Sequence, residues 1–514
     1  MIKRVLLSTV VLALLVPMAF AQTLKIATGE DWENLDPAYA GAVQTGAIVS
    51  KLYDGLMRYS YETTDVVPNL AERFEANDEA TEFTFYLRED VKFHDGTPLT
   101  AHDVKYSFER VLDPDTGSSL GWVFADALIS GASDFAKGEA SEVSGIEVVN
   151  DYTIKISLDG PYSLLLHHLS MPAAHVVPQH IASELGEDFS SNPIGTGPFI
   201  FESRVRDSNL VLKANKDYFA GAPKIDGVEY RIITESLIRW EEFMAGNLHS
   251  SGIPDAIFPQ VMADESMADQ IVSQAELATF YWAMNQRFEP FQDIRVRRAM
   301  AMAIDREAIL AGPYNGKDVL ANGPIPPGLA GYVGHDSIEY DPEGAKALLA
   351  EAGYGDGFEV EIWSTTAETT VAANELIQFF LSEVGVDVTI NQVDFGTMID
   401  AAINGRASAL LLSWYADYAD AYNFLHPLYV ASGAQRYAYS NPKVTELVEK
   451  AAATANFDER MPMYEEIEQL IVDDIPVVYL RHPVVYFAQA KNITGLLNHP
   501  IFNADKFVLV EIGE

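Results

Sequence analysis

Strand-like and helix-like patterns alternate in the second half of the chain, and this alternation constrains the fold more than any other feature. Apolar side chains alternate with polar ones in residues 358–362 and again in residues 386–390. Between them a helical pattern runs from about residue 368 to residue 384 and ends at Gly385. Strand, helix and strand at this spacing predict a βαβ unit, so we expect an α/β protein with a parallel pair of strands.

Two further local patterns predict defined elements. Asp341, Pro342 and Glu343 combine an N-cap, a proline in the first turn and an acid that suits a helix N-terminus, and Gly353 follows the helical stretch. Alternating apolar residues at 83–87 predict a half-buried strand. With 514 residues, the chain is too long for one hydrophobic core, so we expect two or three domains.

The amino-terminal segment has the pattern of a secretory signal. Lys3 and Arg4 precede an apolar run, and Ala19-Phe20-Ala21 offers small residues at the spacing of a cleavage site. We therefore expect residues 1–21 to be a signal peptide. The chain contains no Cys, which excludes disulfides, zinc–thiolate sites and a lipidated Cys anchor. We expect a protein that diffuses freely in the periplasm.

Acidic residues dominate the charge balance. The formal net charge is −41 at pH 7, and such a surface repels nucleic acid and anionic lipid. We expect no nucleic-acid partner. The acidity indicates either a surface adapted for solubility or a field that attracts cationic solutes.

The stretch "FHDGTPLTAHDV" (93–104) repeats His-Asp and allows two interpretations. His94, Asp95 and His102 could be metal ligands. Alternatively, Asp95 opens a turn, and Thr100 with Asp103 forms a capping box that begins a helix. We favour the turn and the helix cap, because they account for the same residues with no metal.

Several motifs in fixed order resemble a known family. The longest is "NLAERFEANDEATEFTFYLREDVKFHDGTPLTAHDVKYSFERV" (69–111). Others are "IGTGPFIF" (194–201), "ANKDYFAGAPKIDGVEYRII" (214–233), "YDPEGAKALLAEAGY" (340–354) and "SWYADYADAYNFL" (413–425). Together they resemble the family 5 extracytoplasmic solute-binding proteins, which include the dipeptide- and oligopeptide-binding proteins of ABC importers.

The resemblance implies an α/β fold, a two-lobed clamshell with two hinge crossings and an extra α+β domain on the first lobe. The first lobe would comprise residues 22–65, 160–265 and 478–514. The extra domain would be 66–159, and the second lobe 266–477. Two strands that cross between the lobes would form a hinge, which lets the lobes close on a ligand.

The resemblance also assigns ligand-binding residues. In peptide-binding members, the Asp of an Ala-Asp-Tyr motif holds the α-ammonium group of the ligand, and Asp417 is the matching position. Trp414, Tyr415 and Tyr418 flank it and could form walls of the site. Asp420 stands in the same motif, but Ala421 follows it where the family usually has Pro, and we expect a structural role for Asp420.

Two other segments are candidates for lining the site. Tyr281, Trp282 and Asn285 are expected on the first strand of the second lobe. Glu30 and Asp31 follow a predicted strand and could face the cleft. Ordinary core positions for the first three, and ordinary surface acids for the last two, stay open as alternatives.

One departure from the family leaves the ligand class open. Some peptide-binding members carry an Arg on the strand before the Ala-Asp-Tyr motif, and this chain has Leu411 there. Residues 364–374 also lack the Arg of dipeptide specialists. The ligand could be a longer peptide held through its backbone, or an oligosaccharide stacked on aromatic rings.

The sequence favours binding over catalysis. It has no Cys nucleophile and no His-Glu-x-x-His helix. We therefore expect no enzyme and no cofactor or metal, with a secreted hydrolase as the less favoured alternative. The expected partners are a small solute, preferably a peptide, and the permease subunits of an ABC transporter, and we expect a monomer.

Overall fold

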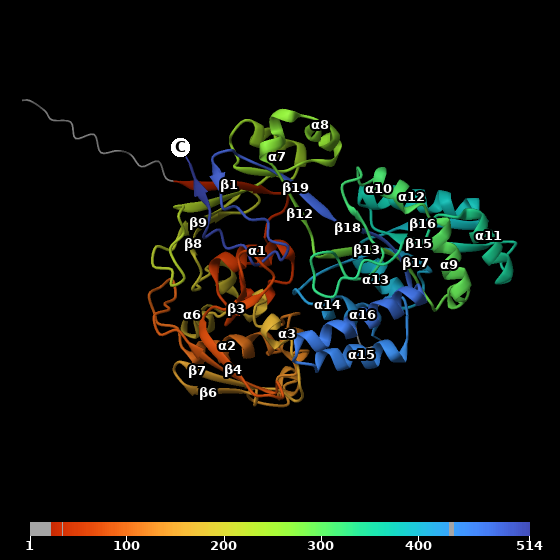
Figure 1. The fold of residues 1–514 in the computed structure, drawn as a ribbon. Coiled ribbons are helices and arrows are strands. Elements are labelled where there is room, and N and C mark those ends of the chain that lie inside the picture. Colours follow the sequence, from red (N-terminus) through yellow and green to blue (C-terminus); the bar gives the residue numbers. More distant parts are fainter. Residues whose placement is uncertain (1–21, 33, 431–435, 514) are drawn as a thin grey trace, which may run out of the picture.

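The computed structural model describes residues 22–32, 34–430 and 436–513. Figure 1 shows an α/β lobe built mainly from the first part of the chain, a smaller domain next to it and a second α/β lobe beside both. The end of the chain returns to the first lobe, close to its first strand (Figure 1). The expected signal peptide, residues 1–21, lies outside the described residues. No helix in the described ranges is both long and apolar enough to cross a membrane.

The first lobe is built on a four-stranded sheet in the order β1-β10-β9-β8. Its strands are β1 (Thr23–Thr28), β8 (Phe199–Val205), β9 (Asn209–Ala214) and β10 (Gly227–Ile232). β1 pairs in parallel with β10, whereas β9 is antiparallel to both of its neighbours. Leu24, Leu212 and Val228 are buried in one core with residues of α1 (Val43–Leu52). The lobe thus joins segments that lie far apart in the sequence.

The smaller domain contains an antiparallel sheet in the order β4-β5-β7-β6. Its strands are β4 (Ala71–Ala76), β5 (Glu82–Leu87), β6 (Ile146–Asn150) and β7 (Thr153–Ser157), and α2 (Ala101–Leu112) belongs to the same domain. Phe83, Phe85 and Leu87 are buried, as the alternation predicts. Phe85 shares a core with Phe108 of α2.

The His-Asp stretch forms a turn and a helix cap. The Asp103 carboxylate accepts hydrogen bonds from the backbone N–H and the hydroxyl of Thr100, both at 2.9 Å. The ring of His94 lies against the backbone, with Nε2 3.0 Å from the carbonyl oxygen of Gly197. Asp95 accepts a hydrogen bond from the backbone N–H of Thr97. These side chains therefore fix the chain path.

The second lobe is built on a six-stranded sheet in the order β14-β18-β13-β17-β15-β16. The strands are β13 (Ala278–Met284), β14 (Val319–Leu320), β15 (Phe358–Ser364), β16 (Val386–Gln392), β17 (Ala409–Tyr415) and β18 (Val477–His482). β15 and β16 are parallel and are connected by α12 (Glu368–Glu383), which confirms the predicted βαβ unit. The predicted N-cap is also confirmed, because Asp341 accepts a hydrogen bond from Gly344 N–H at the start of α11 (Pro342–Glu351).

Two crossings connect the lobes. A three-stranded sheet pairs β11 (Ser250–Gly252) and β12 (Ile271–Ala275) with β19 (Val484–Gln489). β12 leads directly into β13, and β18 leads directly into β19, so both crossings lie side by side. Glu276 N–H donates to the carbonyl oxygen of Pro483 at 3.0 Å and ties them together. This arrangement is that of a two-strand hinge. The exact domain ranges expected from the resemblance stay a prediction.

The remaining helices and short strand pairs complete the layers. The other helices are α3 (Trp122–Ala125), α4 (Ala132–Ala136), α5 (Leu165–His168), α6 (Gln179–Leu185), α7 (Ser236–Met244), α8 (Phe258–Met262), α9 (Ile294–Ala303), α10 (Arg306–Ala311), α13 (Phe395–Ile403), α14 (Tyr422–Tyr429), α15 (Pro442–Ala452) and α16 (Phe457–Asp474). Two short strand pairs are β2 (Met57–Tyr59) with β3 (Val66–Pro68), and β20 (Ile493–Thr494) with β21 (Glu511–Ile512).

Candidate ligand-binding site

A cavity of ≈ 750 Å³ opens where the smaller domain and the first lobe meet the second lobe. The second lobe contributes Trp414, Asp417, Tyr418 and Tyr422 to its lining. The opposite wall includes Trp122, Asp126, Tyr162 and His168. A cavity of this size, lined by aromatic rings with a few polar groups, is typical of a small-molecule site.

The end of β17 places Asp417 at this cavity. β17 ends at Tyr415, and the chain turns before α14 begins at Tyr422. Asn423, in the first turn of α14, accepts a hydrogen bond from Asp417 N–H at 2.9 Å and donates one to the Asp417 carboxylate at 3.1 Å. The carboxylate is therefore fixed in direction before any ligand arrives.

The Asp417 carboxylate has no cationic partner within the described residues. Burial raises the pKa of this carboxyl above its usual range, and the hydrogen bond from Asn423 offsets this only in part. A carboxylate withdrawn from water is costly unless it is paired. The site can therefore stabilise a positively charged group that enters the cavity.

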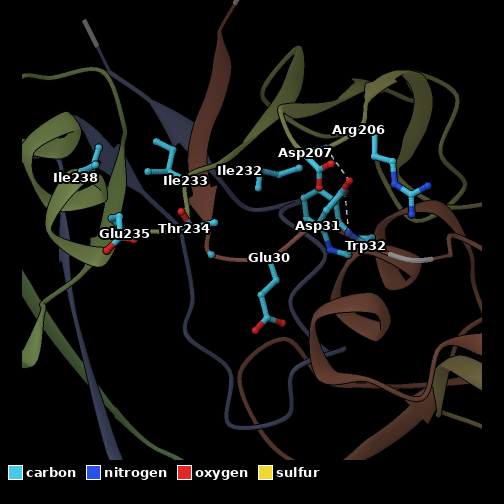
Figure 2. A pocket seen from close by; sticks show the side chains of 11 residues that line it. Glu30, Asp31, Trp32, Arg206, Asp207, Ile232, Ile233, Thr234, Glu235 and Ile238 are labelled. Atoms are coloured by element: carbon cyan, nitrogen blue, oxygen red, sulfur yellow. Dashed lines mark hydrogen bonds between the residues drawn. The ribbon is translucent and has the colours of Figure 1, made fainter. Parts of the chain in front are cut away.

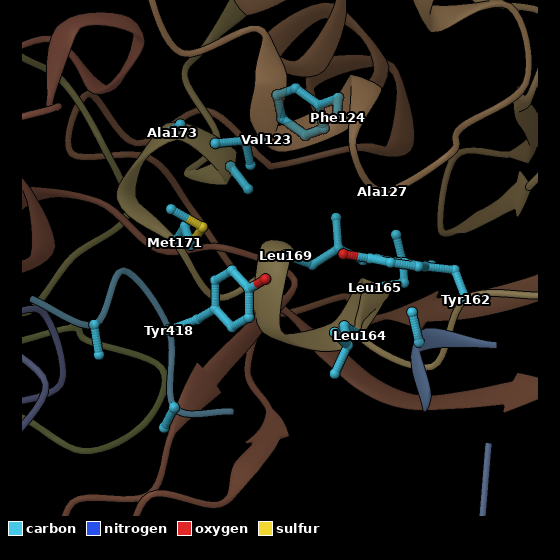
Figure 3. Close-up of a cluster of buried hydrophobic side chains, with 14 of the residues drawn as sticks. Val123, Phe124, Ala127, Tyr162, Leu164, Leu165, Leu169, Met171, Ala173 and Tyr418 are labelled. Atoms are coloured by element: carbon cyan, nitrogen blue, oxygen red, sulfur yellow. The ribbon is translucent and has the colours of Figure 1, made fainter. Parts of the chain in front are cut away.

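Tyr418 joins the two sides of the cavity. Its ring is buried and lies 5.0 Å from the ring of His168, centroid to centroid. Figure 3 shows Tyr418 beside Met171, in a cluster that also contains Tyr162 and Leu165. The apolar contact thus runs from the second lobe into the segment that follows the smaller domain.

Polar contacts also hold this part of the second lobe against the first part of the chain. Tyr59 Oη accepts a hydrogen bond from Ala419 N–H at 3.1 Å. Arg460 donates to Ser163 Oγ at 2.6 Å, and Ser163 N–H donates to the carbonyl oxygen of Ala452 at 3.0 Å. These contacts connect residues hundreds of positions apart and join the second lobe to segments of the first part of the chain.

Comparisons with known proteins agree with this architecture. A family model described as "Bacterial extracellular solute-binding proteins, family 5 Middle" matches residues 65–436. Di/tripeptide-binding protein 2 of Pseudomonas aeruginosa (strain UCBPP-PA14) is 31% identical over 513 residues, which cover 94% of each chain. The chain belongs to the family 5 extracellular solute-binding proteins.

Solved structures of similar proteins share the fold of this family 5 chain. HbpA2 from Haemophilus parasuis superposes with a TM-score of 0.84 at 26% identity and covers 96% of this chain and 100% of its own. The periplasmic binding protein DppA from Helicobacter pylori, in complex with the peptide STSA, gives a TM-score of 0.80 at 26% identity. That match covers 96% of this chain and 98% of the other. The two-lobed clamshell inferred from the motifs is confirmed.

Three residues expected to line the site lie instead in the core of the second lobe. Tyr281 is 2% exposed and Trp282 is fully buried against Phe291. Asn285 donates to the carbonyl oxygens of Ala402 and Ala407. The physical reason is that β13 is an inner strand, paired on both edges with β17 and β18, so its side chains serve the packing of the sheet.

Tyr415 also stays outside the cavity. It is the last residue of β17 and is 43% exposed. Its ring makes an edge-to-face contact with Phe280, with centroids 5.9 Å apart. Successive strand residues point to opposite faces, so Trp414 reaches the cavity while its neighbour does not.

Glu30 and Asp31 line a second cavity, of ≈ 560 Å³, in the first lobe. Asp31 accepts hydrogen bonds from Arg204 and from Asp207 N–H, both at 2.9 Å. It therefore forms an ion pair with Arg204 that has a structural role. Figure 2 shows Glu30 pointing away from this cluster. The structure does not bring either residue to Asp417.

Asp420 has the structural role that its sequence context suggests. It is buried, and its carboxylate bonds to Arg460 at 3.1 Å and to the hydroxyl of Tyr464 at 2.6 Å. Its charge is thus compensated inside the lobe, in contrast to that of Asp417.

Sequence reasoning missed the residues on the opposite wall. Trp122, Asp126, Tyr162 and His168 carry no motif that separates them from ordinary core or surface residues. Burial lowers the pKa of His168 to about 4, so its ring is neutral at pH 7. Only the docking of the smaller domain, and of the segment that follows it, against the second lobe brings these side chains to the cavity.

A metal site and a hydrolase nucleophile were the chemical alternatives to a binding site, and the described residues show no arrangement that fits either. No group of three or more His, Cys, Asp or Glu side chains is arranged there to hold a metal ion. Residues 117–121 have the Gly-x-Ser-x-Gly spacing of a hydrolase nucleophile, which requires a strand before the turn and a helix after it. Here α2 precedes the turn, and Ser119 is exposed on it, so this pattern is a loop.

Proposed function

We propose that this protein is the substrate-binding component of an ABC importer and that it captures short peptides between its lobes. The observation that carries the proposal is the oriented, unpaired Asp417 carboxylate at an aromatic-lined cavity between the lobes. A similar protein is a di/tripeptide-binding protein, and a similar structure holds the peptide STSA.

Asp417 binds the α-ammonium group of the peptide. In an open form the carboxylate is hydrated, and on closure it exchanges water for the ammonium group. The ion pair then offsets the cost of burial, so closure is favourable when a ligand is present. The Asn423 side chain holds the carboxylate through a hydrogen bond of 3.1 Å. Trp414 and Tyr418 provide the apolar contact for peptide side chains.

The carboxyl end of the peptide is bound without a cationic clamp. Among the described residues that line the cavity, none is Lys or Arg. Leu411, at the place where some relatives have Arg, is 6% exposed and faces the core. Backbone hydrogen bonds and bridging water are therefore the means of holding the rest of the peptide.

Transport requires binding without turnover. The peptide leaves the cavity unchanged when the lobes open at the permease of an ABC transporter. The protein works in the periplasm as a monomer, and its acidic surface keeps it soluble there.

Isothermal titration calorimetry tests the proposal. The protein is unfolded and refolded to remove any ligand carried through purification. It is then titrated with a tripeptide library that has free amino ends, with the same library after Nα-acetylation, and with cellotriose. We expect binding of the free-amino library alone. Equal binding of the acetylated library would remove the role of Asp417, and binding of cellotriose alone would identify a sugar binder.

A further inference from the structure

The wall opposite Asp417 carries a second acid, Asp126. It follows α3 of the smaller domain and lines the same cavity. Within the described chain its carboxylate accepts no hydrogen bond and has no cation at ion-pair distance. Its backbone N–H is used in the helix, through a bond to the carbonyl oxygen of Trp122 at 2.8 Å. The Asp126 side chain is exposed and lines the cavity.

Three acids that are buried elsewhere in this protein have cationic partners. Asp36 pairs with Arg110, Asp54 with Lys506 and Asp420 with Arg460. These pairs show how the fold normally compensates a carboxylate that it withdraws from water. Asp417 is partly buried and lacks such compensation. Asp126 is exposed at the cavity and has no cationic partner among the described residues. Partial loss of hydration raises the pKa of both carboxyls.

The aromatic rings near Asp126 suit a cation. Tyr162 and Tyr422 line the cavity and lie edge to face, with centroids 6.3 Å apart. Burial is the main cause of the raised pKa of Tyr422, and the charge of Asp126 is the largest electrostatic cause. Asp126 and both rings line the same cavity. Aromatic faces beside a carboxylate attract Lys and Arg side chains through cation–π and ionic contact.

We propose that the cavity selects peptides with a Lys or Arg side chain at the first or second residue. Asp417 holds the α-ammonium group, and Asp126, with the rings of Tyr162 and Tyr422, holds the basic side chain. This inference rests on the proposed function, because it assigns a specificity to the same cavity. It gives the smaller domain a direct part in ligand selection.

The experiment compares ligands that differ in one charge. Lys-Ala-Ala and Ala-Lys-Ala are titrated against norleucine analogues, in which an uncharged side chain of similar length replaces lysine. In the unchanged protein, we expect at least one lysine peptide to bind 10-fold or more tightly than its analogue. In Asp126→Asn, this preference is expected to fall to less than 3-fold, while binding of the norleucine peptide is kept.

Asp134→Asn is the matched control. Asp134 is exposed on α4 of the same domain, and its substitution changes the net charge by the same amount. We expect the lysine preference to be unchanged in this variant. Retained binding of the norleucine peptide also shows that Asp126→Asn is folded.

The outcomes separate the two proposals. Equal binding of lysine and norleucine peptides, or a lysine preference that survives Asp126→Asn, overturns the role of Asp126 and leaves peptide capture intact. Loss of the preference in Asp134→Asn would assign it to the overall charge of the protein and would overturn the local site. If none of these peptides binds, the proposal of peptide capture is overturned, and the proposed specificity is overturned with it.

Discussion

Ala419 N–H donates a hydrogen bond to Tyr59 Oη at 3.1 Å, and this bond connects the loop after β17 to a strand on the other side of the cavity. Tyr59→Phe leaves the Ala419 N–H without its acceptor. An unmade hydrogen bond of this kind costs about 1–3 kcal/mol. We expect peptide affinity to fall by about 5-fold to 100-fold, because the ligand-bound, closed form loses the bond.

Calorimetry measures the affinity, and small-angle X-ray scattering measures the contraction on binding. Tyr86→Phe is the control, because its hydroxyl bonds to an exposed acid, Glu75, on the smaller domain. A Tyr59→Phe protein with unchanged affinity would mean that this contact does not accompany closure.

Asp417→Asn separates binding from stability. The amide keeps the size of the side chain but loses the charge that holds the α-ammonium group. We expect peptide binding to weaken by about 2–5 kcal/mol, as for a truncated partner of a buried charge pair. The melting temperature of the free protein should stay the same or rise, because the desolvated acid is gone. A fall in melting temperature with unchanged affinity would contradict the assignment.

Peptide binding should depend on pH below neutrality. Burial raises the pKa of Asp417 in the free protein, so this carboxyl takes up a proton at a higher pH than an exposed Asp does. Only the ionised form attracts the ammonium group. Affinity is therefore expected to be constant near pH 7 and to fall as the pH drops towards 4.5. The α-ammonium group stays charged throughout this range.

Calorimetry at pH 7.0, 6.0, 5.0 and 4.5 checks this expectation. In Asp417→Asn, the weaker residual binding should depend less on pH. An unchanged pH profile in the variant would assign the titration to another group.

We expect Glu276, at the hinge, to make the stability of the protein depend on pH. It lies between β12 and β13, and burial raises its pKa to about 7, with a smaller contribution from Asp318 and an opposing one from Arg481. Between about pH 4.5 and 7 the folded protein therefore binds more protons at this site than the unfolded chain. Stability conferred by the protonated form is present at low pH and is lost as the pH rises towards 7.

Glu276→Gln removes this dependence. We expect the variant to be more stable than the parent at pH 8 and equally stable at pH 4.5. The difference should change by less than about 1.4 kcal/mol per pH unit, because a single proton is involved. The remaining hydration of the half-buried side chain reduces the total effect further. Calorimetric melting at both pH values measures it. Parallel melting curves for parent and variant would remove Glu276 as the cause.

Asp420→Asn breaks the buried pair with Arg460. Because one buried charge is left without compensation, we expect a loss of about 3–5 kcal/mol in the stability of the second lobe. Glu446→Gln is the control, since the pair of Glu446 with Lys443 is exposed and should change stability by less than about 1 kcal/mol. Thermal unfolding followed by calorimetry compares the two. Similarly small losses of stability in the two variants would mean that Arg460 is compensated by other groups when the Asp420 charge is removed.

Local patterns in the sequence predicted local structure well. The N-cap at Asp341, the capping box at Asp103 and the βαβ unit of β15, α12 and β16 all depend on residues that are neighbours in sequence. Hydrogen bonds and apolar faces within such segments are set by spacing alone. The order of the longer motifs likewise indicated the family, and the comparisons confirmed it.

Sequence patterns did not distinguish the cavity from the core. Trp282 and Trp414 lie in similar apolar strand patterns, yet Trp282 is buried in the sheet and Trp414 reaches the cavity. The difference depends on what packs over each strand, and strand periodicity carries no information about it.

The sequence by itself indicated several local elements and the family, and it predicted Asp417 as the acid that binds the ligand. The tertiary structure alone decided which side chains meet that acid. Asp126 and Tyr162 lie more than 200 positions before Asp417, and only the docking of separate domains brings them to one cavity. A site of this kind is made by long-range packing, so its composition follows from the folded arrangement of the lobes and not from any one segment.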